Sequence, residues 1–232
     1  MTKVLTWNVG SWSFLQYAKH FHLSYKNQKI VHEYFQSRIN GTMISSFIKK
    51  TDPDIFFLQE IADLHTDLQN IKILKNYPYR EFARSSHELH HILIASKKPL
   101  TKNTKKHFII VRQKDDDVFY VPVHLNTFSS HSRAKDITTL TQLTHKYPKL
   151  IIAGDTNIFR ARRRFLLRKD KKTYRHITAT MKDATHSIVS TTAFGLMLDR
   201  VFHSSTITIK NAHSPRVRGR FMDHYPVVFT AS

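Results

Sequence analysis

The stretch KLIIAGDTNIF, residues 149–159, joins a short apolar run to a carboxylate and an amide. The near-continuous run from Leu150 to Ala153 is typical of a strand that is covered on both faces. Asp155 and Asn157 follow where this run ends. We therefore predict a buried strand that delivers polar side chains to the edge of a layered sheet.

Similar runs, rich in Val, Ile and Phe, recur along the chain. They are KVLTWNV (3–9), DIFFLQE (54–60), HILIAS (91–96), HFIIVRQ (107–113), VFYVPVHL (118–125), LDRVFHS (198–204), TITIK (206–210) and YPVVFTA (225–231). Helical spacing of apolar residues occurs near residues 43–48 and again over about 132–147. Many strands with few, separated helices predict an α/β protein whose sheets pack together with the helices outside.

The composition favours a basic, single-domain protein. The chain has 232 residues, of which 41% are hydrophobic, so one domain over residues 1–232 with a buried core is the simplest expectation. Lys and Arg total 37 against 17 Asp and Glu, which gives a net charge of +20. Such a charge attracts polyanions, either nucleic acid or an anionic membrane surface. A basic proteome or a solubility effect would produce the same excess.

The sequence also excludes several classes of protein. It contains no cysteine, which rules out disulfides and thiolate metal sites. The first residues, MTKVLTWNVG, lack the apolar core of a signal peptide. No run approaches the roughly 18 apolar residues of a transmembrane span. We expect a monomeric, cytoplasmic protein without a transmembrane segment.

The stretch SHELHHILIAS, residues 86–96, contains the H-E-x-x-H spacing of zinc peptidases at His87, Glu88 and His91. That chemistry requires both histidines on one face of a helix. His91 instead begins a β-branched apolar run that is typical of a strand. On a strand the two histidines lie about 13 Å apart, too far to share one zinc ion. In a chain with 16 histidines we interpret the match as accidental.

Polar side chains recur at the ends of the apolar runs, where sites on layered sheets usually form. Alone, each has an ordinary interpretation as a turn or capping residue. Together they suit metal-assisted hydrolysis of a phosphoester, in which carboxylates hold a hard cation and a carboxylate or a His–Asp pair handles the proton of water. The set comprises Asn8, Glu60, His124, Asp155, Asn157, Asp199, Asp223 and His224.

The order and the sequences of the segments that carry these residues resemble the endonuclease/exonuclease/phosphatase superfamily, which includes exonuclease III-like and deoxyribonuclease I-like enzymes. The matching blocks are LTWNVG, PDIFFLQEI, VHLNT, IIAGDTNIF, LDRVF and MDHYPVVF. Each block alone is weak, but six in family order cover nearly the whole chain. The resemblance implies a four-layer α/β sandwich, two packed mixed β-sheets flanked by helices.

The resemblance also implies a role for each of these residues. Glu60 would bind Mg²⁺ or Mn²⁺, with Asp223 at the edge of the metal site. Asn8 would help to place the metal or the phosphate, and Asn157 would contact the phosphate. Asp155 would orient or deprotonate the attacking water, or assist the leaving group.

The two histidines would act on the phosphate. His124 and His224 would neutralise its oxygens, and either could move a proton. Asp199 would orient His224 through a hydrogen bond that sets the tautomer.

Two positions depart from the family pattern. Gly10 stands where many members carry an acidic residue, which makes a second metal ion less favourable. Met222 stands where a serine often precedes the final Asp-His pair, so that hydroxyl is missing.

Charge is the best indicator of the substrate. Residues 160–172, RARRRFLLRKDKK, carry eight Lys or Arg and one Asp directly after the Asn157 block. We expect phosphate contacts here, because counterion release supplies much of the affinity for nucleic acid. The candidates are Arg160, Arg162, Arg163, Arg164, Arg168 and Lys169.

Aromatic side chains near the strand ends have two interpretations. Trp12, Phe14 and Phe159 would stack on unpaired bases or, as is more usual for such residues, belong to the core.

We expect a Mg²⁺-dependent nuclease acting on DNA. The alternatives are a DNA end-processing phosphodiesterase of the tyrosyl-DNA type, which Thr156 in GDTN suggests, and a phospholipid or inositol phosphate hydrolase. A catalytically silent nucleic-acid-binding module is disfavoured by the intact Glu60, Asp155, Asn157 and His224.

Overall fold

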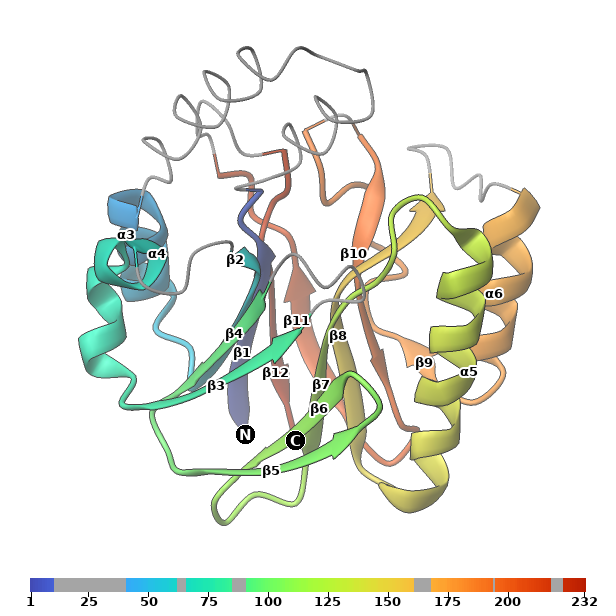
Figure 1. The fold of residues 1–232 in the computed structure, drawn as a ribbon, viewed down its shortest axis with the longest axis horizontal. Helices are drawn as coiled ribbons and strands as arrows, with labels where there is room; N and C mark the ends of the chain where they lie inside the picture. The colour runs from blue at the N-terminus through green and yellow to red at the C-terminus, as the bar shows by residue number, and fades with distance from the viewer. Residues whose placement is uncertain (11–40, 62–65, 85–90, 161–167, 194, 218–222) are drawn as a thin grey trace.

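The computed structural model describes residues 1–10, 41–61, 66–84, 91–160, 168–193, 195–217 and 223–232. Strands form two six-stranded sheets, each mixed (Figure 1). Sheet A has the order β11 (Ile209–His213), β12 (Val227–Ala231), β1 (Thr2–Asn8), β2 (Ile55–Ile61), β4 (His91–Ser96) and β3 (Tyr79–Arg84). Sheet B has the order β5 (Leu100–Lys105), β6 (Phe108–Gln113), β7 (Phe119–His124), β8 (Leu150–Arg160), β10 (Met197–His203) and β9 (Lys182–Asp183).

Helices cover the outer face of each sheet (Figure 1). Helix α3 (Gly41–Thr51), helix α4 (Thr66–Asn70) and the 3₁₀ helix η1 (Lys72–Asn76) lie beside sheet A. Helices α5 (Ser130–Lys146) and α6 (Arg168–Thr178) lie beside sheet B. This arrangement is the expected four-layer sandwich, and both predicted helices are confirmed as α3 and α5.

Alternating side chains explain the layers, because successive residues of a strand face opposite sides of a sheet. In β1, Val4 packs between the two sheets, whereas Leu5 and Trp7 pack against α3. In β8, Ile151 and Ala153 face the other sheet, and Leu150 and Ile152 face the helices α5 and α6. Each central strand is therefore apolar on both faces, as the near-continuous runs predicted.

The polar edge strands were not predicted. The strand β5, LTKNTK, exposes every residue after Leu100, and β3 exposes four of its six residues. Exposed edge strands carry polar and charged side chains, so they lack the apolar signature of a buried strand. The strand predicted at TITIK, residues 206–210, starts too early, because β11 begins only at Ile209.

One histidine of the zinc-peptidase spacing lies on a strand, which excludes the helix that a zinc-peptidase site requires. His91 is the first residue of β4, whose remaining residues are buried, so the predicted strand is confirmed. His87 and Glu88 lie outside the described residues. No helix in the described part of the chain is both long and apolar enough to cross a bilayer.

Candidate active site

Four of the predicted site residues lie at the same end of the two sheets. The strands β1 and β2 are parallel neighbours in sheet A, and β7 and β8 are parallel neighbours in sheet B. Asn8, Glu60 and His124 lie at or next to the carboxyl ends of β1, β2 and β7, and Asp155 lies within β8 where its pairing with β7 ends. Crevices at the carboxyl ends of parallel strands are the usual ligand sites of open α/β sheets. Here the ends of both parallel pairs converge on one buried polar centre.

A glycine brings the two strands of sheet B together at this point. Gly154 has φ +140°, and a Cβ there would lie 2.1 Å from the Val123 carbonyl oxygen. No other residue type allows that approach without a shift of the backbone. The next pair in the register is His124 and Asp155. The Gly-Asp sequence thus places the carboxylate directly beside the imidazole.

Glu60 reaches the site because its strand is irregular. Ile55 and Phe57 face the other sheet and Phe56 and Leu58 face α3, so simple alternation would turn Glu60 toward the helix layer. Instead, the pairing of β2 with β4 shifts register after Leu58, and Glu60 has φ +62°. A bulge of this kind redirects a side chain, and strained backbone is characteristic of functional positions. The irregularity turns the Glu60 carboxylate inward.

The Asn8 amide links the carboxylates of the two sheets. Its Nδ2 donates to Glu60 Oε1 and to Asp155 Oδ2, both at 2.9 Å. The backbone N–H of Gly10 donates to Asn8 Oδ1 at 2.9 Å, which fixes the orientation of the amide. Gly10 has φ +61°, a conformation that glycine adopts readily. Gly10 therefore orients Asn8 through its backbone, a role that the sequence did not indicate.

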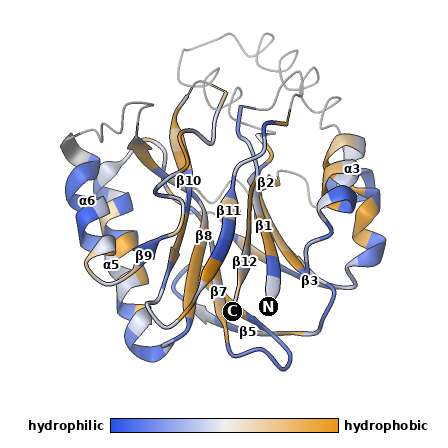
Figure 2. Cartoon of the chain, turned by 180° about the vertical axis from the view of Figure 1, so that it is seen from behind, coloured by the Kyte–Doolittle hydropathy of each residue, from blue (hydrophilic) through white to orange (hydrophobic). Residues whose placement is uncertain are grey.

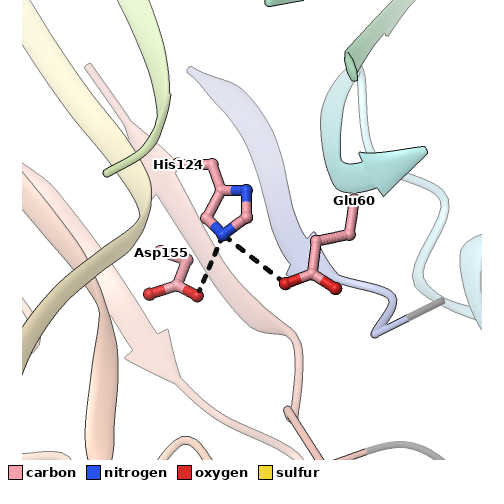
Figure 3. A group of neighbouring side chains, drawn as sticks. All are labelled: Glu60, His124 and Asp155. Carbon is pink, nitrogen blue, oxygen red and sulfur yellow. Dashed lines mark ion pairs between the residues drawn. The ribbon is translucent and has the colours of Figure 1, made fainter. Parts of the chain in front are cut away.

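His124 lies between the two carboxylates (Figure 3). Its Nε2 is 3.5 Å from Glu60 Oε1 and 3.8 Å from Asp155 Oδ2. One ligand atom of each residue lies within 4.8 Å of the others, and all three residues are buried. Two carboxylates and an imidazole at this separation can share one metal ion.

His224 also lies beside Asp155. Its Nε2 is 3.8 Å from Asp155 Oδ2, and its Nδ1 is 2.8 Å from Asp199 Oδ2. Asp199 is fully buried, and its backbone N–H donates to Thr191 Oγ1 at 3.1 Å. The indole of Trp7 donates to the His224 carbonyl oxygen at 3.2 Å. Neither Thr191 nor Trp7 was predicted, since one threonine or one core tryptophan gives no signal in a sequence.

Asn157 and Thr156 are held by the surrounding chain. Asn157 has φ +49°; its N–H donates to Asp155 Oδ1, and its Nδ2 donates to the Leu125 carbonyl oxygen, each at 2.9 Å. The amide thus fixes the segment that follows His124. Thr156 is buried and donates to the Leu198 carbonyl oxygen at 2.8 Å, so its hydroxyl gives no indication of the substrate.

Burial dominates the electrostatics of the site. Burial raises the pKa of Glu60 to about 7, with Asp223 and Asp155 adding to the rise and Asn8 and His224 opposing it. Burial also lowers the pKa of His124. Burial disfavours the ionised form of a carboxyl group, and a nearby cation stabilises that form.

The pair of His224 and Asp199 behaves differently. Burial alone would lower the pKa of His224, but the carboxylates of Asp199 and Asp155 raise it well above its ordinary value. Burial raises the pKa of Asp199, and the adjacent imidazolium opposes that shift. We place the shared proton on His224, because two carboxylates face it. The pair is then a neutral ion pair in which the positively charged imidazolium of His224 is the partner that faces Asp155.

The donor set fits a divalent cation. Carboxylate oxygens are the ligands that Mg²⁺ and Mn²⁺ prefer, and an imidazole is compatible with Mn²⁺. Asp223, which was predicted at the metal edge, is outside the compact group of Glu60, His124 and Asp155. Its Oδ1 is nevertheless buried and has no hydrogen-bond partner among the described residues. A buried carboxylate oxygen in that state suits a cation or a water molecule bound to one.

Several predicted residues cannot be placed. Arg162, Arg163, Arg164, Trp12, Phe14 and Met222 lie outside the described residues. Arg160 ends β8, and Arg168 and Lys169 begin α6. Phe159 is half-buried, and the Arg133 guanidinium lies 5.8 Å from the centre of its ring.

Comparisons with known proteins agree with this geometry. The family model described as Endonuclease/Exonuclease/phosphatase family matches residues 5–221. The search of curated proteins found no match.

Solved structures with the same fold cover nearly the whole chain. One is the 3′ phosphatase NExo from Neisseria bound to a product DNA hairpin (14% identity, TM-score 0.69, 100% of both chains). Others are an AP endonuclease from Archaeoglobus fulgidus (14% identity, TM-score 0.66, 99% of both chains) and humanized D. rerio TDP2 (19% identity, TM-score 0.68, 100% of this chain and 98% of that chain). At these identities the likeness shows a shared fold.

Proposed function

The chain belongs to the endonuclease/exonuclease/phosphatase family, and on that premise we propose that it is a divalent-metal-dependent phosphodiesterase that hydrolyses DNA. The observation that carries the proposal is the buried network in which Asn8 bridges Glu60 and Asp155 while two histidines face Asp155. Family members are hydrolases of phosphoester bonds. The net charge of +20 favours a polyanionic substrate such as DNA.

In this proposal the carboxylates bind the metal and position the water. Glu60 is the principal metal ligand, and Asp223 lies at the edge of the site. A bound Mg²⁺ or Mn²⁺ supplies Lewis-acid stabilisation of the charge on the phosphoryl oxygens. Asp155 accepts a hydrogen bond from the attacking water and takes its proton as the water oxygen bonds to phosphorus. The bond from phosphorus to the leaving oxygen breaks, and the leaving oxygen is protonated by solvent.

The nitrogen groups hold the phosphate. The His224 imidazolium, with its Nδ1–H directed to Asp199, points Nε2 toward the reacting phosphate and neutralises its developing charge. His124 binds a phosphoryl oxygen from sheet B, and the Asn8 amide, whose two N–H groups go to Glu60 and Asp155, holds those carboxylates in place. Preorganised donors of this kind stabilise the transition state because they need no reorientation during the reaction.

A substrate panel tests the proposal. The protein, with Mg²⁺, Mn²⁺ or EDTA, is incubated with plasmid DNA, an abasic duplex, a 5′-tyrosyl oligonucleotide and sphingomyelin. We expect metal-dependent cleavage of DNA, and its loss in Asp155→Asn. Turnover of only the tyrosyl oligonucleotide would assign the protein to end processing, and turnover of only sphingomyelin to lipid hydrolysis. Either result contradicts a general nuclease.

A further inference from the structure

An exposed aromatic side chain lies beside the site on the segment between β7 and α5, residues 125–129. Phe128 is 55% exposed, more than any other Phe, Tyr or Trp side chain in the described residues. It follows His124 by four positions. The Leu125 N–H donates to the Asp155 carbonyl oxygen at 2.9 Å, and the Leu125 carbonyl accepts from Asn157. The segment therefore borders the active site directly.

This segment holds its shape through hydrogen bonds of two side chains to its backbone. Asn126 Oδ1 accepts from the N–H of Phe128 at 2.9 Å and from that of Ser129 at 2.7 Å. Arg133 Nη1 donates to the carbonyl oxygens of Asn126 and Thr127 at 2.8 and 2.9 Å. An exposed ring on a fixed backbone is preorganised for binding, because little conformational entropy is lost when a ligand stacks on it.

The same arginine joins the segment to two helices. Arg133 Nη2 lies 2.7 Å from Asp170 Oδ1, and both side chains are buried. Further along the helices, Thr141 Oγ1 lies 3.3 Å from His176 Nε2. The order of these contacts shows that α5 and α6 run side by side in the same direction, and both begin at the end of sheet B that carries the site (Figure 1).

The outer faces of these helices are cationic. Asp136 and Asp170, the acidic residues of α5 and α6, are both buried. Exposed cations remain at positions that we call the α5–α6 cationic face: Lys135, Lys171, Lys172 and Arg175. They lie within about 10 Å of the helix starts, from the 1.5 Å rise per residue. Figure 2 shows the hydrophilic character of α6.

We propose that Phe128 and the α5–α6 cationic face form a subsite for single-stranded nucleic acid that extends from the active site. One base stacks on Phe128, and the phosphates that follow lie over the cations. An aromatic platform beside a positive surface is the common way to bind a single strand without sequence preference. The inference rests on the proposed nuclease function, because it takes the strand that the site would cleave.

A membrane surface fits these helices less well. Helices that lie in a membrane interface bury a large apolar face. The exposed large apolar residues in the described part of the chain are Met1, Tyr79, Phe82, Phe128 and Val189, and none belongs to α5 or α6. Phosphates of a nucleic acid require only the cations that are present.

Binding without cleavage tests the platform. Affinity for a labelled 15-nucleotide oligo-dT is measured by fluorescence anisotropy in EDTA. We expect Phe128→Ala to weaken binding about 5- to 150-fold, the range for loss of one base–aromatic stack. Phe128→Tyr should keep the affinity. The matched control is Phe82→Ala, which removes a 38% exposed ring from β3, an edge strand of the other sheet, and should change nothing.

The salt dependence tests the cationic face. Lys171→Ala combined with Lys172→Ala should flatten the slope of log K against log salt by about 1 to 1.5, since each phosphate contact on a single strand contributes about 0.7. The control pair is Lys49→Ala with Lys50→Ala, exposed lysines at the end of α3. An unchanged slope in the first pair would remove the helices from the subsite.

The outcomes separate the subsite from the nuclease proposal. Wild-type affinity in Phe128→Ala overturns the subsite. If Phe128→Ala loses only binding to anionic phospholipid vesicles while oligo-dT binding is unchanged, the surface belongs to a lipid partner and the proposal is also overturned. Bis(p-nitrophenyl) phosphate is too short to reach Phe128, so its hydrolysis should be unaffected. If the wild type hydrolyses no phosphodiester, the nuclease proposal fails, while binding in EDTA still decides the subsite.

Discussion

Replacing Asp199 with asparagine should slow hydrolysis without weakening substrate binding. The substitution keeps the size of the side chain but removes the charge that faces His224 Nδ1 at 2.8 Å. Asp199 is fully buried, so it cannot contact substrate directly. A hydrogen bond to a charged group contributes roughly 1.5–3 kcal/mol. If that contribution is realised in the transition state, kcat should fall about 10- to 150-fold while KM stays nearly constant.

The assay separates positioning from folding. Steady-state hydrolysis of bis(p-nitrophenyl) phosphate gives kcat and KM, and thermal unfolding measures stability. Asp183→Asn is a matched control, since it removes another buried carboxylate, 3.0 Å from Arg200 Nη1 in sheet B. Asp183→Asn should lower stability and leave kcat of the folded protein intact. A kcat for Asp199→Asn within about threefold of wild type, only ~0.7 kcal/mol, would refute a positioning role.

Three further changes have expected outcomes. Glu60→Gln should abolish Mn²⁺ binding in a calorimetric titration while leaving the thermal unfolding curve intact, and unchanged affinity would remove Glu60 from the metal site. Alanine at residues 162–164, outside the described residues, should flatten the salt slope for duplex DNA by roughly one to three units and spare a small phosphodiester. Asp170→Leu should destabilise the fold by about 3–5 kcal/mol in urea unfolding, because Arg133 would be left buried without its partner; a loss below ~1 kcal/mol contradicts this.

The alternation of apolar residues was sufficient to predict the layers. The run from Leu150 to Ala153 is buried on both faces, and this pattern identified β8 as an inner strand. The same reasoning placed His91 on a strand and so excluded a zinc-peptidase helix. Polar edge strands such as β5 gave no comparable signal, because solvent rather than a core determines their composition.

Several residues that the sequence singled out lie together in the structure, but their geometry was not predicted. The family-like blocks identified Asn8 and Glu60, yet no pattern indicates that a bulge turns Glu60 inward. Such irregularities depend on pairing between distant strands, which a local sequence window does not contain. Phe128 was overlooked for a related reason: the segment that carries it is held by Arg133, which pairs with Asp170 of another helix, and a local sequence window does not show such contacts.

The two sheets differ in how far apart in the sequence their paired strands lie. All strands of sheet B lie within one stretch, Leu100–His203, whereas sheet A needs β1 to pair with β12, with Thr2 opposite Ala231. Pairings so distant in sequence form slowly, because loop closure must precede them. We therefore expect the pairing of β1 with β12, which completes sheet A, to form last during folding. His224 lies just before β12, so we expect it to enter the site with the final strand, and the proposed activity would then require β12 to be paired.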